Sequence, residues 1–202
     1  MAARVLLRLG LSKAAGPRIS PAQWEFSEAQ QERPRVRAGL PQIRYSVSHV
    51  DELVMVAISS TVDVGLDVES VDHEISDSML SEFCHSDEQR SIRPLSVSRQ
   101  SREFLRMWTL KEAYTKMRGV GHGIDFSSLD FLPGRSGSAT PRVERDGTAV
   151  GFENFYVSMG HDLLHASLAY QARGAAVGDT EISITSLVDP AGHPVHLNPA
   201  MS

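Results

Sequence analysis

Apolar and polar side chains alternate most regularly in the segment TVDVGLDVES, which covers residues 61–70. Successive side chains on a β-strand point to opposite faces, so the valines and the leucine share one face and the acidic residues share the other. Gly65 lies on the acidic face, where the missing side chain leaves room for a close approach to the backbone. We predict a strand here, with Asp67 and Glu69 projecting from the same side.

A second regular pattern, with the period of an α-helix, covers residues 100–118. The apolar side chains that recur at this period, which we assign to the core, are Met107, Leu110, Ala113, Tyr114 and Met117. Trp108, Glu112 and Lys116 follow one another at intervals of four on roughly the opposite face. A Glu–Lys pair at this spacing contributes only about 0.2–0.5 kcal/mol. From the pattern alone, this line is either a surface ion pair beside a tryptophan or part of a site.

Weaker patterns predict the remaining elements. Residues 1–15 and 76–94 are expected to be helical, and the segment 31–42, which contains two prolines and a glycine, is expected to be a loop. The expected strands begin at Ile43 and then cover residues 53–59, 127–132, 141–145, 149–158, 163–171 and 181–188. The tail after Pro190 is expected to be loose. The resulting fold class is α+β.

The overall composition is that of an ordinary globular protein, with 41% hydrophobic and 22% charged residues. The formal net charge of −5 argues against non-specific binding of nucleic acid, which needs a basic surface. Cys84 is the only cysteine, so it forms no internal disulfide, and we expect it to be a small core residue. Arg8 interrupts the apolar first segment, which falls short of the roughly 20 apolar residues of a membrane span. We therefore expect a cytoplasmic protein that binds neither nucleic acid nor a membrane.

The carboxylates of Asp67 and Glu69 are the first candidates for chemistry. Two carboxylates on one strand face repel each other unless a cation or a basic side chain lies between them. Oxygen ligands of this kind suit magnesium, a hard ion that usually shares its coordination shell with substrate phosphates. The alternative is a solvent-facing acidic strand face, and the D-x-E spacing by itself favours this simpler interpretation.

Two short polar motifs precede this strand, Arg33-Pro34 and Ser46-Val47-Ser48-His49. Taken in order, R-P, S-x-S-H, G-L-D-V-E at residues 65–69 and W-T-L-K-E-A-Y-T-K at residues 108–116 closely resemble the 4′-phosphopantetheinyl transferase superfamily. The last two segments match its two signature motifs, and the resemblance extends over nearly the whole chain, from about Arg4 to about Leu187. The separation between the motifs is similar to that of the Sfp type, which activates non-ribosomal peptide and polyketide machinery.

The resemblance implies a fold of two similar α+β halves in one chain. The N-terminal half, residues 1–62, is expected to be shortened, because family members usually carry roughly 40 more residues before the position of Arg4. Residues 63–175 are expected to form the C-terminal half with the metal-binding motifs, and residues 176–202 a last strand and a loose tail. The Sfp type also implies a monomer, whereas the smaller holo-acyl-carrier-protein synthase type assembles as trimers.

The implied reaction is a magnesium-dependent transfer of 4′-phosphopantetheine from coenzyme A to a serine of an apo acyl or peptidyl carrier protein, with release of adenosine 3′,5′-bisphosphate. By motif position, Asp67, Glu69 and Glu112 are the implied metal ligands, and Glu112 and Lys116 the implied catalytic residues. The residues implied to bind coenzyme A are Arg33, Ser48, His49, Lys111 and Lys116. Glu88 matches a supporting acidic position, and Trp108 is expected to pack near the site.

Some features depart from the family pattern or have no assigned role in it. Ser46 stands where many members have asparagine. The shortened start leaves one alternative open, an N-terminally truncated module that binds coenzyme A or a carrier with weak or no activity. Carrier proteins tend to be acidic near the modified serine, so we hypothesise that a run of arginines docks the carrier, although a solvated helix face is the simpler interpretation: Arg90, Arg93, Arg99, Arg102 and Arg106. The histidines at 161, 165, 193 and 196 lack metal-ligand spacing and are treated as structural.

Overall fold

The computed structural model describes residues 2–16, 18–27, 35–51, 53–71, 75–120, 123–131, 149–159, 161–172, 183–186 and 195–199. In these segments the helices are α1 (Ala2–Ala15), α2 (Asp77–Phe83), α3 (Ser86–Ile92) and α4 (Val97–Arg118), with single 3₁₀ turns at Pro21–Gln23 and Phe126–Ser128. The strands are β1 (Arg44–Val50), β2 (Leu53–Ser59), β3 (Asp63–Ser70), β4 (Ala149–Met159), β5 (Asp162–Ala172), β6 (Ser183–Ser186) and β7 (Val195–Pro199). The predicted α+β class is confirmed. None of the described helices is long and apolar enough to span a bilayer.

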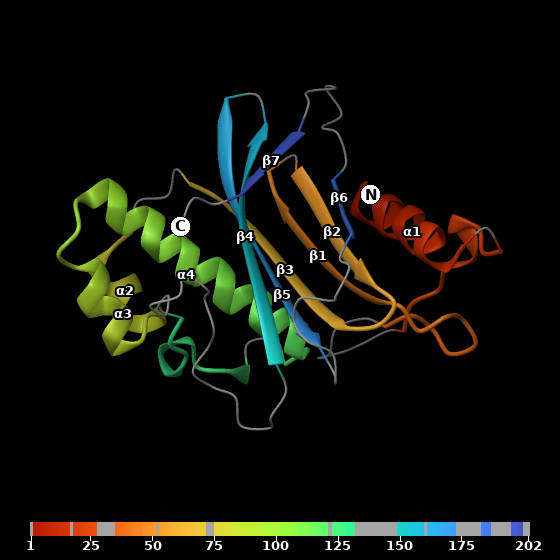
Figure 1. The fold of residues 1–202 in the computed structure, drawn as a ribbon, viewed down its shortest axis with the longest axis horizontal. Helices are drawn as coiled ribbons and strands as arrows, with labels where there is room; N and C mark the ends of the chain where they lie inside the picture. Colours follow the sequence, from red (N-terminus) through yellow and green to blue (C-terminus); the bar gives the residue numbers. More distant parts are fainter. Residues whose placement is uncertain are drawn as a thin grey trace.

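The strands form two antiparallel sheets, with the orders β1-β2-β6 and β3-β5-β4-β7. Helix α1 covers the outer side of the first sheet, and α4 crosses the outer side of the second, as Figure 1 shows. Each layer boundary contains its own apolar cluster: one between α1 and the first sheet, one between the two sheets, and one between α4 and the second sheet. The third cluster packs α4 against β4 and β5, through Val150, Phe152 and Ala169.

Strand β3 shows the predicted alternation. Val64, Leu66 and Val68 are buried between the two sheets, and the opposite face of the strand is turned toward α4. A Cβ atom placed on Gly65 would lie 1.9 Å from the backbone oxygen of Ala113, so only glycine allows the helix to approach this closely. The glycine thus explains how Asp67 and Glu69, on the same face, come within reach of α4.

Two serine hydroxyls join the sheets where β1 runs beside β3. Ser46 Oγ accepts the backbone N–H of Leu66 at 2.9 Å, and Ser48 Oγ accepts that of Val68 at 3.3 Å. Both serines are buried, so these hydroxyls satisfy strand N–H groups that would otherwise lose a partner on burial. The hydroxyl of Ser46 therefore has a bonding role in the fold.

The structure differs from the sequence prediction in the segment 76–94. It forms two short helices, because His85 begins α3 as a capping residue: its Nδ1 accepts the N–H of Asp87, and Glu88 Oε2 accepts the N–H of His85. Cys84, at the end of α2, is buried as expected. No glycine or proline marks the break between α2 and α3 in the sequence.

Two further predictions in the C-terminal half are wrong. The strand expected at 127–132 is a 3₁₀ turn followed by irregular backbone over its described part, and residues 195–199 of the tail form β7 against β4. Strands β4, β5 and β6 confirm the predictions at 149–158, 163–171 and 181–188 in their described parts, and the strand at 141–145 lies outside the described residues. The proposed domain boundaries at residues 62 and 175 stay predictions.

Candidate active site

Helix α4 places one line of side chains over the acidic face of β3. At one end of the line, Trp108 Nε1 donates a hydrogen bond to Glu69 Oε1 at 3.3 Å. At the other end, Lys116 Nζ lies 2.6 Å from Asp67 Oδ1. Glu112 is half-buried on the same helix face, one turn from each of them. The line of Trp108, Glu112 and Lys116 therefore faces Asp67 and Glu69 on β3 and is not only a surface ion pair.

Asp67 is the centre of this arrangement, and its side chain is almost fully buried. Its Oδ1 accepts hydrogen bonds from Lys116 and, at 3.0 Å, from the hydroxyl of Ser48. Its Oδ2 is buried with no hydrogen-bond partner. Burial raises the pKa of this carboxyl group above its ordinary value, and the nearby Lys116 ammonium opposes that rise only in part. A buried carboxylate oxygen without a partner is suited to accept a cation.

The donor set fits a magnesium ion. Asp67, Glu69 and Glu112 offer only oxygen ligands, and with Lys116 the four side chains carry a formal charge of −2. Within the described residues these three carboxylates do not yet form a group whose ligand atoms all lie within 4.8 Å of one another. Because the Lys116 ammonium is bound to Asp67, an arriving cation would compete with it for Oδ1.

Ser48 is the only one of the three expected coenzyme A contacts from the N-terminal motifs that lies at this cluster in the described part of the chain. Its single hydroxyl donates to Asp67 and accepts from both Val68 N–H and, at 3.3 Å, Lys116 Nζ. His49 is exposed and follows Ser48 on β1, so its side chain points to the other face of that strand. Arg33 lies outside the described residues.

Lys111 lies away from the Asp67 cluster, and its expected contact with coenzyme A stays a prediction. Its side chain is 1% exposed, and its Nζ donates to Phe83 O at 2.8 Å, to Phe126 O at 2.9 Å and to Glu88 Oε2 at 2.6 Å. An ammonium group has three protons, so these three acceptors use all of them. Lys111 points into the protein, away from the line of Glu112 and Lys116, because one residue along a helix is a turn of about 100°.

Glu88 is correspondingly more than a supporting residue. It is fully buried, and besides Lys111 it accepts the N–H of Phe131 at 2.7 Å and the N–H of His85 at 2.8 Å. The Glu88–Lys111 pair therefore joins α3, α4 and the segment 126–131 beneath the site. Trp108 packs as expected, since it makes ring contacts with Phe83, Phe104 and Phe126.

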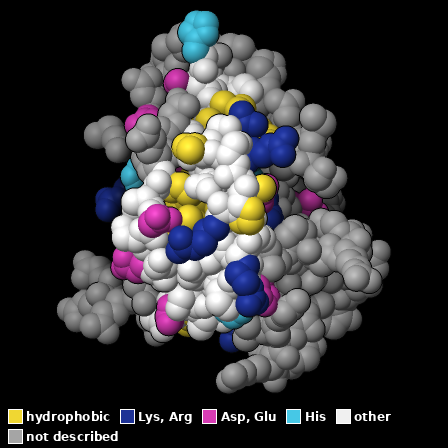
Figure 2. Space-filling view, turned by 90° about the vertical axis from the view of Figure 1, so that its left-hand side faces the viewer, with side chains coloured by type: hydrophobic (Ala, Val, Ile, Leu, Met, Phe, Trp, Pro, Cys, Tyr) yellow, Lys and Arg dark blue, Asp and Glu magenta, His cyan; other side chains and the backbone are white. Residues whose placement is uncertain are grey.

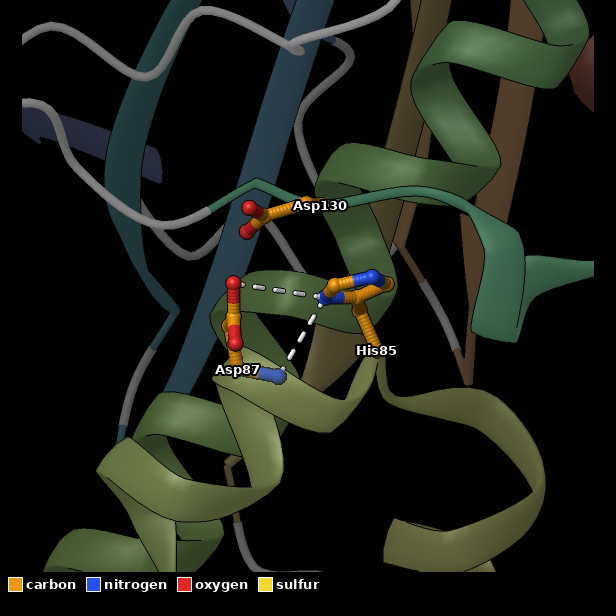
Figure 3. A group of neighbouring side chains, drawn as sticks. All are labelled: His85, Asp87 and Asp130. Carbon is orange, nitrogen blue, oxygen red and sulfur yellow. Dashed lines mark hydrogen bonds and ion pairs between the residues drawn. The ribbon is translucent and has the colours of Figure 1, made fainter.

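A separate group of ligand-type side chains lies at the start of α3. His85, Asp87 and Asp130 bring one ligand atom each within 4.8 Å of the others. Figure 3 shows how the three side chains lie next to one another. Most of this proximity follows from the helix cap, because His85 Nδ1 accepts the Asp87 N–H at 3.2 Å. Asp87 also forms an ion pair with Arg90. These interactions account for the closeness of His85 and Asp87 as part of a helix start.

A buried polar network behind the carboxylates was missed by the sequence interpretation. Thr109 of α4 contacts His165 and Ser167 of β5, and Ser167 contacts Asn154 of β4. The only signal in the sequence is that His165 and Ser167 interrupt the otherwise apolar strand 163–170 two residues apart, on one face. Their partner is more than 50 residues away along the chain, and pattern analysis does not reveal such pairs.

Comparison with known proteins agrees with this geometry. The family model described as "4′-phosphopantetheinyl transferase superfamily" matches residues 63–167, just over half of the chain. The matched segment includes Asp67, Glu69, Glu112 and Lys116.

Three curated relatives are similar to parts of the chain. The 4′-phosphopantetheinyl transferase gsp of Aneurinibacillus migulanus is 35% identical over 87 residues, which cover 43% of this chain and 36% of the relative. The transferase HetI of Nostoc sp. is 30% identical over 124 residues (59% and 51%), and psf-1 of Bacillus pumilus is 29% identical over 111 residues (55% and 46%). The chain thus spans about half the length of these relatives, or less.

Among solved structures, the holo-[acyl-carrier-protein] synthase of Thermotoga maritima aligns with a TM-score of 0.42 and 24% sequence identity, over 56% of this chain and 65% of that one. The family is shown by the family model, whose matched residues include both signature motifs and the side chains of Asp67, Glu69 and Glu112. On that basis the chain belongs to the 4′-phosphopantetheinyl transferase superfamily.

Proposed function

We propose that the protein transfers 4′-phosphopantetheine from coenzyme A to a serine hydroxyl of an apo acyl or peptidyl carrier protein, in a magnesium-dependent reaction that releases adenosine 3′,5′-bisphosphate. The observation that carries the proposal is the buried Asp67 carboxylate, held by Lys116 and Ser48 at one oxygen and without a hydrogen-bond partner at the other. A family match over both motifs supports the same reaction.

Asp67, Glu69 and Glu112 would hold the magnesium ion. The ion, when bound, would neutralise charge on the pyrophosphate oxygens of coenzyme A. Trp108 holds Glu69 by its indole N–H, and Ser48 holds Asp67 by its hydroxyl, so both carboxylates have an orienting partner already in place. The chain therefore supplies both the ligands and the groups that aim them.

Glu112 and Lys116 would carry out the proton and charge steps. The carrier serine Oγ bonds to the phosphorus that bears pantetheine, and the bond from that phosphorus to the bridging oxygen breaks. Glu112 would accept the serine proton, and Lys116 would stabilise or protonate the departing phosphate oxygen. Lys116 is 32% exposed on its side chain, so it can leave Asp67 for a phosphate without a large desolvation change.

The direct test is mass spectrometry of an apo carrier protein incubated with this protein, coenzyme A and magnesium. We expect the carrier to gain the mass of one phosphopantetheine, and to gain nothing when the magnesium is chelated. A carrier of unchanged mass, together with measurable binding of coenzyme A, would favour the alternative of a coenzyme A-binding module without transferase activity. No transfer and no binding would contradict both.

The carrier is proposed to dock beside α4. Figure 2 shows several Lys and Arg side chains on the side of the molecule that includes α2, α3 and the start of α4. Arg90, Arg93 and Arg106 form ion pairs with acidic residues of the same region. Arg99 and Arg102 are exposed on the same face of α4 and form no ion pair with any described residue, which leaves their charge available to an acidic partner.

Reversing both charges, R99E/R102E, is expected to raise the KM for the carrier about tenfold at low salt and to leave the KM for coenzyme A unchanged, because charge on a docking rim chiefly affects encounter. The matched control is R4E/K13E on α1, which makes the same change in net charge at exposed positions away from α4. Equal effects of the two double variants on carrier KM would contradict a specific docking surface.

We also propose that the protein acts in the cytoplasm as a monomer. Its single cysteine, Cys84, is buried, and burial raises the pKa of that thiol to about 11. A thiol with such a pKa is protonated at neutral pH and is therefore unreactive. Light scattering during gel filtration would test the monomer directly.

A further inference from the structure

Thr109 lies at the centre of a buried hydrogen-bond chain between α4 and the second sheet. It is completely buried, and its Oγ1 lies 2.7 Å from Ser167 Oγ and 3.0 Å from His165 Nδ1. Ser167 Oγ in turn donates to Asn154 Oδ1 at 2.9 Å. This chain of hydrogen bonds thus links His165 of β5 to α4, α4 to Ser167 of β5, and Ser167 to β4.

The direction of the protons along this chain follows from counting donors. Ser167 has one hydroxyl proton and gives it to Asn154, so the short contact with Thr109 requires Thr109 to donate to Ser167. Thr109, whose longer contact is to the Arg106 carbonyl at 3.2 Å, then accepts from His165, which must carry its proton on Nδ1. Burial, with a smaller contribution from the Arg106 charge, lowers the pKa of His165 to about 4, which agrees with a neutral ring.

The hydrogen-bond chain begins at residues that lie directly beside Asp67 and Glu69 in the sheet. In the β3–β5 ladder, Ser167 is the register partner of Asp67, and His165 is the register partner of Glu69. Residues paired in this way on antiparallel strands project from the same face of the sheet. Thr109 follows Trp108 and precedes Glu112 by three residues, so it joins the helix to the sheet within one turn of the proposed metal ligand on α4.

Apolar packing by itself does not determine how far along the sheet α4 sits, because the hydrophobic effect has no direction. A chain of hydrogen bonds does, since each bond weakens steeply when its distance or angle changes. We propose that Thr109, together with His165 and Ser167, is a positioning residue of the transferase: it sets the position of α4 along β5 and thereby the distance from Glu112 to Asp67 and Glu69. This inference rests on the proposed function, because the geometry that it fixes is that of the proposed metal site.

The first test compares Thr109→Val, Thr109→Ser and Thr115→Val in the full chain. Valine keeps the shape of threonine and removes the hydroxyl, whereas serine restores it. Thr115→Val is the matched control, because Thr115 is a buried threonine of the same helix whose hydroxyl donates to the Glu112 carbonyl of α4 itself. All three are measured well below their unfolding temperatures, so that lost stability does not appear as lost activity.

Two readings are taken, the affinity for Mn²⁺ without any substrate and kcat at saturating coenzyme A and carrier. For Thr109→Val we expect Mn²⁺ affinity and kcat each to fall about tenfold or more. Losses of this size are common when a residue that orients a metal ligand is removed. Thr109→Ser and Thr115→Val are expected to stay within about threefold of the wild type.

A second pair of variants at His165 keeps the inference testable if Thr109→Val folds poorly. His165→Asn places an amide N–H near the position of Nδ1 and is expected to keep most of the Mn²⁺ affinity, whereas His165→Leu removes the donor and is expected to reduce it about tenfold. The contrast within each pair, more than any single loss, identifies a positioning role.

The outcomes separate this inference from the proposed function. If the wild type transfers phosphopantetheine but Thr109→Val matches it, or if Thr109→Val and Thr115→Val lose metal affinity equally, the positioning role is wrong and the function stands. If the wild type transfers nothing while the Mn²⁺ contrast between valine and serine persists, the function is wrong and the positioning of the metal ligands stands.

Discussion

Asp67→Asn is expected to reduce phosphopantetheine transfer at least about a hundredfold without destabilising the protein. The substitution keeps the shape of the side chain but replaces the oxygen that the structure leaves without a hydrogen-bond partner, Oδ2, and removes the negative charge. Removing a residue that only orients a metal ligand commonly costs about 10–100-fold, so loss of the ligand itself should cost at least the upper part of that range.

The stability expectation follows from the pKa of Asp67. Burial raises this pKa above its value in the unfolded chain, so the folded state favours the neutral carboxyl group. The stability linked to such a group is fully present below the unfolded-state pKa and is lost as the pH rises through the folded-state value. Where the carboxyl group is ionised, its burial therefore opposes folding, and the neutral amide removes that cost while its oxygen still accepts from Lys116 without the charge. We expect the Tm of Asp67→Asn in the absence of magnesium to equal or exceed that of the wild type.

Magnesium provides the second measurement. Because an ion that binds only the folded state stabilises it, magnesium should raise the Tm of the wild type and leave that of Asp67→Asn unchanged. The control is Asp63→Asn, the same substitution on the same face of β3, where Asp63 forms a surface ion pair with Arg44 at 2.7 Å. Asp63→Asn should keep both the activity and the magnesium response. A normal magnesium response in Asp67→Asn would remove Asp67 from the metal site.

The parts of this site that were predictable from sequence are those that local periodicity determines. The alternation in residues 62–69 placed Asp67 and Glu69 on one strand face, and the four-residue spacing placed Trp108, Glu112 and Lys116 on one helix face. Gly65 marked the point where the helix crosses the strand. Each of these signals depends only on neighbours within a few residues, and a single sequence contains that information in full.

The parts that were not predictable depend on distant partners. A lysine beside a signature glutamate is most simply read as a phosphate ligand, and only the fold shows that Lys111 meets Glu88 from another helix and carbonyls from two further segments. Likewise, the tail beyond Pro190 has little strand pattern of its own, but β7 gains its backbone hydrogen bonds from the edge of β4. Tertiary context overrides a weak local preference in both cases.

Lys111→Met is expected to be the most destabilising of the substitutions considered, at about 3–5 kcal/mol. Methionine fits the volume of the lysine stem, but it leaves the buried Glu88 carboxylate without its cation and two backbone carbonyls, Phe83 O and Phe126 O, without their donor. Breaking one side of a buried ion pair is costly because the remaining charge stays out of water. Urea unfolding monitored by circular dichroism would measure the loss, and Arg102→Met, which removes an exposed cation from the same helix, should stay within about 0.5 kcal/mol of the wild type.

The same variant decides between the two roles that Lys111 has been given. If Lys111 contacted the phosphates of coenzyme A, Lys111→Met would raise the KM for coenzyme A and change the free energy of unfolding little. With Lys111 buried against Glu88, the variant should instead lose stability, and the part that remains folded at low temperature should bind coenzyme A with nearly normal affinity, because none of the three protons of the ammonium points toward the Asp67 cluster. A stable Lys111→Met protein with a strongly raised KM would overturn this assignment and return Lys111 to the coenzyme A site.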